Sequence, residues 1–462
     1  MTPEEFRRNG YQLIDWIAEY LATVEQRPVG PMVDPGWVTS QLPAHPPAAP
    51  ESFDAVMADM DSIVVPGLTQ WPHPSFFAYF PANAMLSSVL GDLAAAGLAV
   101  NGMTWATGPS ATEVETVVMD WMRELLALPE TWIGNGVIQD SASSSTLVSI
   151  LAARDRARAR TGASIDRLVG YSTASAHSSI EKGLRIAGIP AERFRVVAHD
   201  ERFAMRPDAL AAAIASDRDG GLEPFWVCAA RGSTSSLAMD PVVDLVEVCT
   251  RERVWLHVDA AMAGIAALCP EHRWVNNGLD GVDSYVTDAH KWMGVNFDCS
   301  LFWVRDRAPL LDSLSIQPAY LRHKGSDSGA TIDYRDWQIP LGRRFRALKL
   351  WWVLRCEGVD ALQLMLRNHV AWAKELTAYM EHDERFELVA PTDLNLVTFA
   401  LRSGDEATVS VVESINASGK ALMTKTVLDG RSAARVSVGN RLTEHRHVLA
   451  LWDQLSALAD TV

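Results

Sequence analysis

The sequence predicts an α/β protein whose central, mainly parallel sheet is buried between helices. Short apolar runs alternate with helical segments from about residue 85 to 310. A parallel sheet covered by helices on both faces produces this rhythm, because its strands meet little water on either face. The apolar runs lie at residues 168–171, 194–198, 225–228, 254–258 and 301–304.

The remaining segments indicate two smaller parts. Residues 3–25 repeat apolar positions at helical spacing, which predicts an amphipathic N-terminal helix that lies as an arm against another surface. Seven prolines between residues 28 and 50 then predict an ordered linker. After a helix around 348–354, helices and three strands (386–389, 394–401 and 434–438) predict a smaller α+β unit. We therefore expect an arm and linker over 1–84, a large domain over 85–358 and a C-terminal domain over 359–462.

The composition of the chain limits the kinds of binding partner that we expect. The chain has 462 residues, with 41 Lys and Arg against 57 Asp and Glu, and its formal net charge of −16 should repel nucleic acid and anionic membranes. Its five cysteines are widely spaced and include no Cys-x-x-Cys pair, so neither a disulfide framework nor a metal site is expected. With no apolar stretch long enough to span a bilayer and no signal sequence, we expect a cytoplasmic protein that acts on a small molecule.

Two charged residues suggest the chemistry. Asp259 directly follows the apolar run 254–258, and Lys291 lies in an apolar setting with Trp292, Met293 and Val295 nearby. Ligands of open parallel sheets gather at the carboxyl ends of strands, and a desolvated lysine favours its neutral, nucleophilic amine. An amine and an anion are what pyridoxal phosphate needs for its aldehyde and its ring nitrogen. The alternatives are a helix cap for Asp259, before a helix at 260–264, and a surface position for Lys291.

Longer motifs make the prediction more specific. They are Pro66–Trp71, His73–Pro81, Val137–Ser143, Ala176–Lys182, Trp255–Ala261, His290–Trp292, Asn296–Ser300 and Trp337–Arg346. On these motifs the chain resembles the aromatic-L-amino-acid decarboxylase family, the group II pyridoxal phosphate decarboxylases, and we expect a bacterial-type member. The resemblance implies the aspartate-aminotransferase-like fold (fold type I) with a seven-stranded sheet. It also implies a homodimer in which the arm wraps the partner and the active site lies at the subunit interface.

The resemblance assigns four catalytic residues. Lys291 would form the Schiff base with the cofactor, and Asp259 would pair with the protonated ring nitrogen. His177 would stack on the ring and position the substrate carboxylate, although Ser178-x-x-Glu181 also reads as a helix capping box. Tyr320 would donate the proton to Cα after carbon dioxide leaves, from a polar, glycine-containing segment that suits a lid.

Further cofactor contacts follow from the same resemblance. Ala261 would cover the second ring face and Thr234 would lie near the cofactor. The serine-rich start of a helix, with Ala142 and Ser143, would bind the phosphate, because free N–H groups at a helix N-terminus attract anions. His290 would add a polar contact. Asp288 departs from the asparagine usual in the family, and its carboxylate would be a like charge beside the phosphate.

The expected substrate pocket is aromatic and suits a flat ring. Its proposed members are Trp71, Tyr79, Phe80, Pro81, Ala82, Asn101, Met103 and Gly342, with Trp105 beside them. Of these, Asn101 and Met103 replace residues that relatives lend from the partner subunit. We expect an L-amino acid of the L-DOPA, 5-hydroxytryptophan, tryptophan, phenylalanine or tyrosine class. The alternatives are a decarboxylase of a non-aromatic amino acid, an aldehyde synthase and, suggested by Asp288, a homologue that binds the cofactor without turnover.

Overall fold

A seven-stranded sheet forms the centre of the large domain. In the computed structural model, which describes residues 1–316 and 331–461, its strand order is β1-β7-β6-β5-β4-β2-β3. Only β7 runs against its neighbours, so the predicted mainly parallel sheet is confirmed. The strands are β1 (Gly136–Gln139), β2 (Leu168–Thr173), β3 (Phe194–Val197), β4 (Glu223–Ala230), β5 (Trp255–Asp259), β6 (Ser284–Asp288) and β7 (Ser300–Val304).

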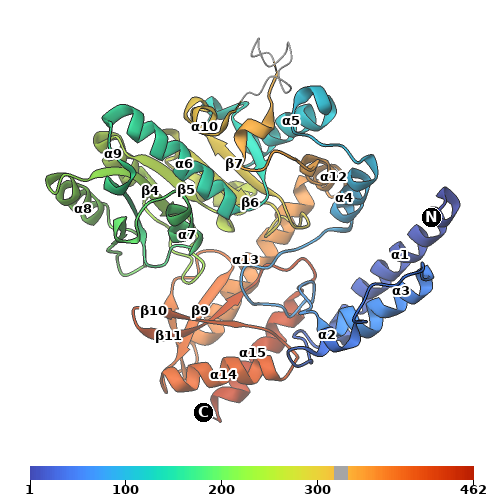
Figure 1. Ribbon diagram of the computed structural model, residues 1–462. Coiled ribbons are helices and arrows are strands. Elements are labelled where there is room, and N and C mark those ends of the chain that lie inside the picture. The colour runs from blue at the N-terminus through green and yellow to red at the C-terminus, as the bar shows by residue number, and fades with distance from the viewer. Residues whose placement is uncertain (317–330, 462) are drawn as a thin grey trace.

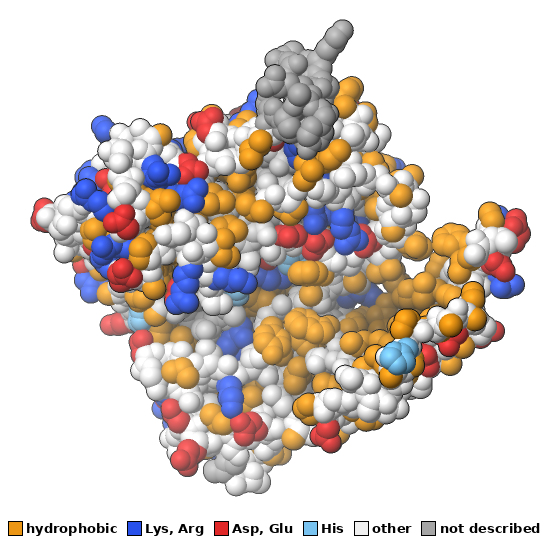
Figure 2. Space-filling view, viewed as in Figure 1, with side chains coloured by type: hydrophobic (Ala, Val, Ile, Leu, Met, Phe, Trp, Pro, Cys, Tyr) orange, Lys and Arg blue, Asp and Glu red, His pale blue; other side chains and the backbone are white. Residues whose placement is uncertain are grey.

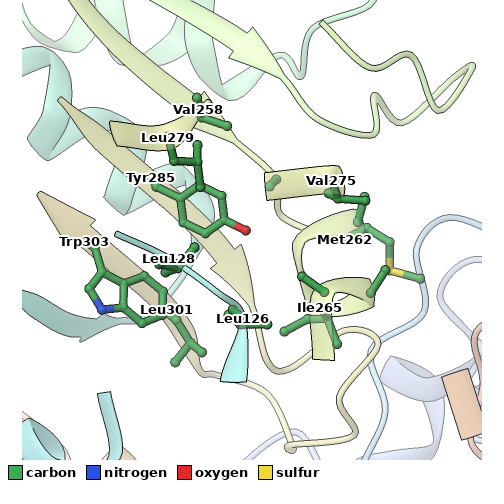
Figure 3. Packing of buried hydrophobic residues seen from close by; sticks show 14 of the residues in the cluster. Leu126, Leu128, Val258, Met262, Ile265, Val275, Leu279, Tyr285, Leu301 and Trp303 are labelled. Atoms are coloured by element: carbon green, nitrogen blue, oxygen red, sulfur yellow. The ribbon is translucent and has the colours of Figure 1, made fainter. Parts of the chain in front are cut away.

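Helices cover both faces of this sheet (Figure 1). In β5, Leu256 and Val258 belong to one apolar cluster and Trp255 to another, as expected for alternate side chains that point to opposite faces. Figure 3 shows part of the first cluster, in which the rings of Tyr285 and Trp303 lie 6.2 Å apart. The helices are α4 (Leu86–Leu98), α5 (Pro109–Leu125), α6 (Ala142–Thr161), α7 (Ser179–Ile186), α8 (Pro207–Asp219), α9 (Val242–Glu252), α10 (Ala308–Leu314) and α12 (Arg346–Cys356).

The C-terminal part is a smaller unit packed below the large domain in Figure 1. Its four-stranded antiparallel sheet has the order β10-β11-β9-β8. All three predicted strands are present, and β10 is an additional one. The elements are α13 (Val359–Glu381), β8 (Phe386–Ala390), β9 (Leu396–Leu401), α14 (Asp405–Ala417), β10 (Thr424–Leu428), β11 (Arg431–Ser437) and α15 (His445–Ala459).

The N-terminal arm projects from the body (Figure 1). As predicted, it begins with a long helix, α1 (Pro3–Thr23), which Thr2 and Glu5 start with a capping box. A short helix α2 (Trp37–Gln41) interrupts the proline-rich linker, and α3 (Phe53–Asp59) returns beside α1. Side-chain hydrogen bonds join α1 to this returning segment. Within the described residues, no helix combines the length and apolarity needed to cross a membrane.

Candidate functional site

Three strand ends surround a cavity of about 150 Å³ at one edge of the large sheet. Asp259 is the last residue of β5, Ala230 ends β4, and Asp288 ends β6 three residues before Lys291. The cavity is lined by Phe80, Ser141, Ala142, Ser143, His177, Ala230, Gly232, Ser233, Thr234, Asp259, Ala261, Asp288, His290 and Lys291. All nine residues predicted to contact the cofactor therefore meet in one place, although they are spread over 150 positions of the chain.

Asp259 is held by the turn that follows its strand. Its Oδ1 accepts a hydrogen bond of 3.0 Å from the N–H of Ala261. Burial and the nearby Asp288 raise the pKa of its carboxyl, against the opposing effects of Lys291, Ala261 and His177. The alternative of a helix cap before 260–264 is wrong, because a 3₁₀-helix begins only at Ala263. Asp259 is thus available to a ligand rather than spent on a helix cap.

Lys291 does not lie in the apolar setting that its sequence neighbours suggested. Its Nζ forms an ion pair of 2.8 Å with Oδ2 of Asp288, whose side chain is almost fully buried. Burial opposes the charge of Asp288, but Lys291, His290 and hydrogen bonds from Lys291 and Ser300 outweigh it, so the pKa of the Asp288 carboxyl is lowered. The apolar residues Trp292, Met293 and Val295 are buried in the core instead.

Hydrogen bonds fix both histidines of the cavity in one tautomer. Nδ1 of His290 accepts a hydrogen bond of 3.0 Å from the N–H of Cys299, so its proton is on Nε2, which lies 3.5 Å from Oδ2 of Asp288. Burial lowers the pKa of His290, which favours the neutral ring. Likewise, Nδ1 of His177 accepts from the N–H of Ser179 at 3.2 Å, which leaves the proton on Nε2.

The capping box expected at the start of α7 is wrong. The side chain of Ser178 makes no capping hydrogen bond, and its backbone angles (φ −59°, ψ −16°) are already helical. Nδ1 of His177 accepts the N–H of Ser179 in its place. His177 therefore starts this helix and borders the cavity at the same time.

The N-terminus of α6 forms the anion-binding end of the cavity. Ser141 caps the helix and accepts a hydrogen bond of 3.3 Å from the N–H of Ser144. Ala142 and Ser143 occupy the first turn, where backbone N–H groups lack helical partners and the helix dipole is positive. Ala230, Gly232 and Ser233 also line the cavity and were not predicted, whereas Ser141 belongs to the serine-rich segment that was expected to face the phosphate. Only Ser141 carried a signal, as a serine before an apolar helix.

Most of the predicted substrate residues lie outside this cavity. Among them only Phe80 lines it. The rings of Trp71 and Tyr79 stack 5.7 Å apart and remain partly exposed. Asn101 and Gly342 line a second cavity of about 340 Å³, and Asn101 accepts a hydrogen bond from the N–H of Arg343.

The other residues predicted to contact the substrate are also separate from the cofactor cavity in the single chain. The structure does not place Pro81, Ala82 or Met103 on its wall. The carbonyl of Met103 instead accepts a hydrogen bond from the N–H of Arg335. Tyr320 lies outside the described residues.

The cavity suits pyridoxal phosphate by its donor set. It offers one amine (Lys291), a carboxylate at a strand end (Asp259), a helix N-terminus for a phosphate, and small Ala261 against a flat ring. Oδ1 of buried Asp288 also has no hydrogen-bond partner within the described residues. A buried polar atom without a partner at the edge of a cavity is typical of a site completed by a ligand.

The comparisons with known proteins agree with this reading. Residues 35–402 match the pyridoxal-dependent decarboxylase conserved domain, and the chain belongs to that family. It is 42% identical to phenylacetaldehyde synthase of Arabidopsis thaliana (98% of this chain, 95% of that protein). It is 40% identical to aromatic-L-amino-acid decarboxylase of Bos taurus (100% and 97%). The crystal structure of Oryza sativa TDC with PLP and tryptamine superposes with a TM-score of 0.98 at 38% identity (100% and 99%).

These findings establish that the chain has the fold of pyridoxal phosphate decarboxylases. They also establish that it is a pyridoxal phosphate-dependent carboxy-lyase. The three relatives are plant and animal proteins, which does not support the expected bacterial type.

Proposed function

We propose that this protein is a cytoplasmic enzyme that decarboxylates an aromatic L-amino acid to the arylalkylamine and carbon dioxide. The convergence of Lys291, Asp259 and His177 on one cavity at the sheet edge carries the proposal. Relatives named for aromatic amino acid decarboxylation, and a neighbour structure that contains tryptamine, support an aromatic substrate. We propose the class of L-DOPA, 5-hydroxytryptophan, tryptophan, phenylalanine and tyrosine.

Each residue of the cavity has a distinct task in this reaction. Bound pyridoxal phosphate supplies an electron sink for the pair that remains when carbon dioxide leaves. Lys291 would hold the cofactor through its side-chain amine. Asp259 keeps the ring nitrogen protonated, because a buried carboxylate strongly favours a cation beside it. The Nδ1 of His177 accepts from the N–H of Ser179, so its Nε2 proton would be free to bind and orient the substrate carboxylate.

We further propose that the enzyme is a homodimer with the active site at the subunit interface. The cofactor cavity and the second cavity, lined by Asn101 and Gly342, are separate in one chain, so a second copy would bring the two together. Leu86, Leu90 and Leu93 on α4 are more than 40% exposed and share one helix face. Apolar side chains also gather along the arm (Figure 2). Such patches are typical of protein interfaces.

A substrate panel tests the proposed function. The purified protein with added pyridoxal phosphate should form amine and carbon dioxide from aromatic L-amino acids, but not from acidic or basic ones. The Lys291→Ala variant should lose this activity. Absence of amine from every aromatic amino acid would contradict the proposal.

Tyr320 separates decarboxylation from aldehyde formation. The resemblance makes it the donor of the proton to Cα, and the chain keeps the residue expected of a decarboxylase. Tyr320→Phe should therefore lose amine and gain aldehyde, ammonia and peroxide in the presence of oxygen. Aldehyde as the main product of the unaltered enzyme would favour the synthase alternative.

A further inference from the structure

The cofactor cavity is short of positive charge. Its lining contains one lysine against two carboxylates, Asp259 and Asp288, and both histidines are held by backbone N–H groups on Nδ1. Among residues 1–316 and 331–461, no arginine borders it. A phosphate dianion that enters this cavity adds about two negative charges. The helix N-terminus offsets only about half of one charge.

The carboxylate of Asp288 is the group that this shortage of positive charge affects most. Its Oδ2 pairs with Nζ of Lys291 at 2.8 Å and faces Nε2 of His290 at 3.5 Å. Asp288 also faces the like charge of Asp259 at the end of β5 and the hydroxyl of Ser300 at the start of β7. Oγ of Ser300 lies 3.4 Å from Oγ of Ser145, which is in the first turns of α6. Asp288 is thus connected to the helix that offers the phosphate site. Its Oδ1 has no partner within the described residues.

Binding of the cofactor removes the lysine that pairs with Asp288 in the described part of the chain. The amine of Lys291 must turn from Asp288 to the cofactor aldehyde. His290 cannot replace it easily, because its Nε2 already carries the proton and a second proton on Nδ1 would break the hydrogen bond from Cys299. A carboxylate buried to 1% exposure, without a cation and beside a phosphate, costs several kilocalories per mole unless it is neutralised.

We propose that Asp288 takes up a proton when pyridoxal phosphate binds, and that it then donates a hydrogen bond to the phosphate as a carboxylic acid. The carboxyl is ionised in the cofactor-free site, where Lys291 pairs with it, and neutral in the loaded site. Asp288 therefore serves as a cofactor-binding donor, and its ion pair with Lys291 belongs to the cofactor-free enzyme only. This inference rests on the cofactor assignment and does not depend on the substrate.

The sign of the pH effect follows from linkage. If the loaded form binds one more proton than the free form, affinity for pyridoxal phosphate falls by up to about tenfold per pH unit between the two pKa values of Asp288. Above about pH 7 the phosphate itself is ionised and adds little to this slope. Asp288→Asn, which keeps a hydrogen-bond donor without a proton to gain, should lose the slope and bind the cofactor more tightly at alkaline pH.

Calorimetry of the cofactor-free protein tests the inference. Titration with pyridoxal phosphate at about pH 8, in buffers of different ionisation enthalpy, counts the protons taken up. The unaltered protein should take up about one proton more than Asp288→Asn. Asp140→Asn is the matched control, because Asp140 lies next to Ser141 but does not line the cofactor cavity, and it should match the unaltered protein. Equal proton counts in the Asp288→Asn variant and the unaltered protein overturn the proposal.

A second titration needs no variant. Pyridoxal without its phosphate should bind the unaltered protein with about one proton less than pyridoxal phosphate, since no dianion enters the cavity. Identical proton uptake for the two ligands also overturns the proposal. Failure of pyridoxal phosphate to bind at all would instead contradict the cofactor assignment, so the two failures are distinguishable.

Discussion

The side-chain amide of Asn83 donates a hydrogen bond of 3.1 Å to the carbonyl oxygen of Lys291. The same amide donates to the carbonyl of Gly439 at 2.8 Å, and its Oδ1 accepts from the N–H of Arg441 at 2.9 Å. One buried side chain therefore ties the end of the linker, the lysine loop and the strand end of the C-terminal unit together. The position of Lys291 depends on contacts between segments far apart in sequence.

Asn83→Ala should lower the free energy of unfolding by about 2–4 kcal/mol, since it leaves several buried backbone groups without partners. Urea unfolding measures this, and weaker binding of pyridoxal phosphate should accompany it because the lysine loop loses its tie. Asn277→Ala, at an exposed asparagine, is the matched control and should change stability by less than about 0.5 kcal/mol. Equal small effects from both variants would contradict the structural role of Asn83.

Asp259→Asn should reduce the turnover rate by about 10²–10³-fold with any accepted amino acid, because the amide cannot stabilise a protonated ring nitrogen. The variant should still bind pyridoxal phosphate through Lys291, and its absorbance should show the bound cofactor. A turnover rate within threefold of the unaltered enzyme, about 0.7 kcal/mol or less, would exclude the proposed role of Asp259.

The strands that the sequence predicted were the apolar ones. β4, β5 and β7 contain largely apolar runs, and such a run can be recognised from a short stretch of sequence. β1 and β6 were not among the predicted strands, and in β6 the residues Ser284–Asp288 mix polar and apolar side chains although all five are buried. Thr287 and Asp288 are buried only because neighbouring strands and the lysine loop cover them, which no short stretch of sequence reveals.

The cofactor residues were predictable for a different reason. The motifs that contain them are long and specific, and all nine residues predicted to contact the cofactor meet in one cavity. The ion pair between Lys291 and Asp288 was not predicted, although the two residues lie only three positions apart. Sequence neighbours of Lys291 are apolar, but the turn after β6 directs its side chain back to Asp288 while Trp292 enters the core. Side-chain direction in an irregular loop is set by the tertiary contacts.

Gly264→Ala should destabilise the segment that follows Asp259. A Cβ at this position would lie 2.2 Å from the hydroxyl of Tyr285 and 2.7 Å from Oγ1 of Thr287, so the 3₁₀-helix would have to move away from β6. Overpacking of this kind costs about 1–3 kcal/mol, measured by urea unfolding. Gly97→Ala in α4 has open space around it and should be neutral or slightly stabilising. A neutral Gly264→Ala would show that the packing of this segment on β6 is looser than the structure indicates.

Glu25 links the end of the arm to α15, and its contribution should depend on pH. The hydrogen bond from Arg446 has the largest effect on its carboxylate and, together with the weaker effect of His447, outweighs burial and lowers the pKa of Glu25 from 4.5 to about 2. A lowered pKa means that the stabilisation is complete above pH 4.5 and is lost as the pH falls towards about 2. Because Glu25 is 43% exposed, solvent screening limits the effect to about 0.5–1 kcal/mol.

Glu25→Gln should therefore lower the free energy of unfolding at about pH 7, and this difference from the unaltered protein should shrink as the pH falls below 4.5. Urea unfolding at several pH values measures both trends. Glu413→Gln removes a comparable exposed pair with Lys425 that lies within the C-terminal unit, so it controls for the loss of a surface charge. If the destabilisation by Glu25→Gln stayed constant down to about pH 3, the charge of the Glu25 carboxylate would not stabilise the contact between the arm and α15. The hydrogen bonds with Arg446 and His447 would then stabilise this contact independently of the charge.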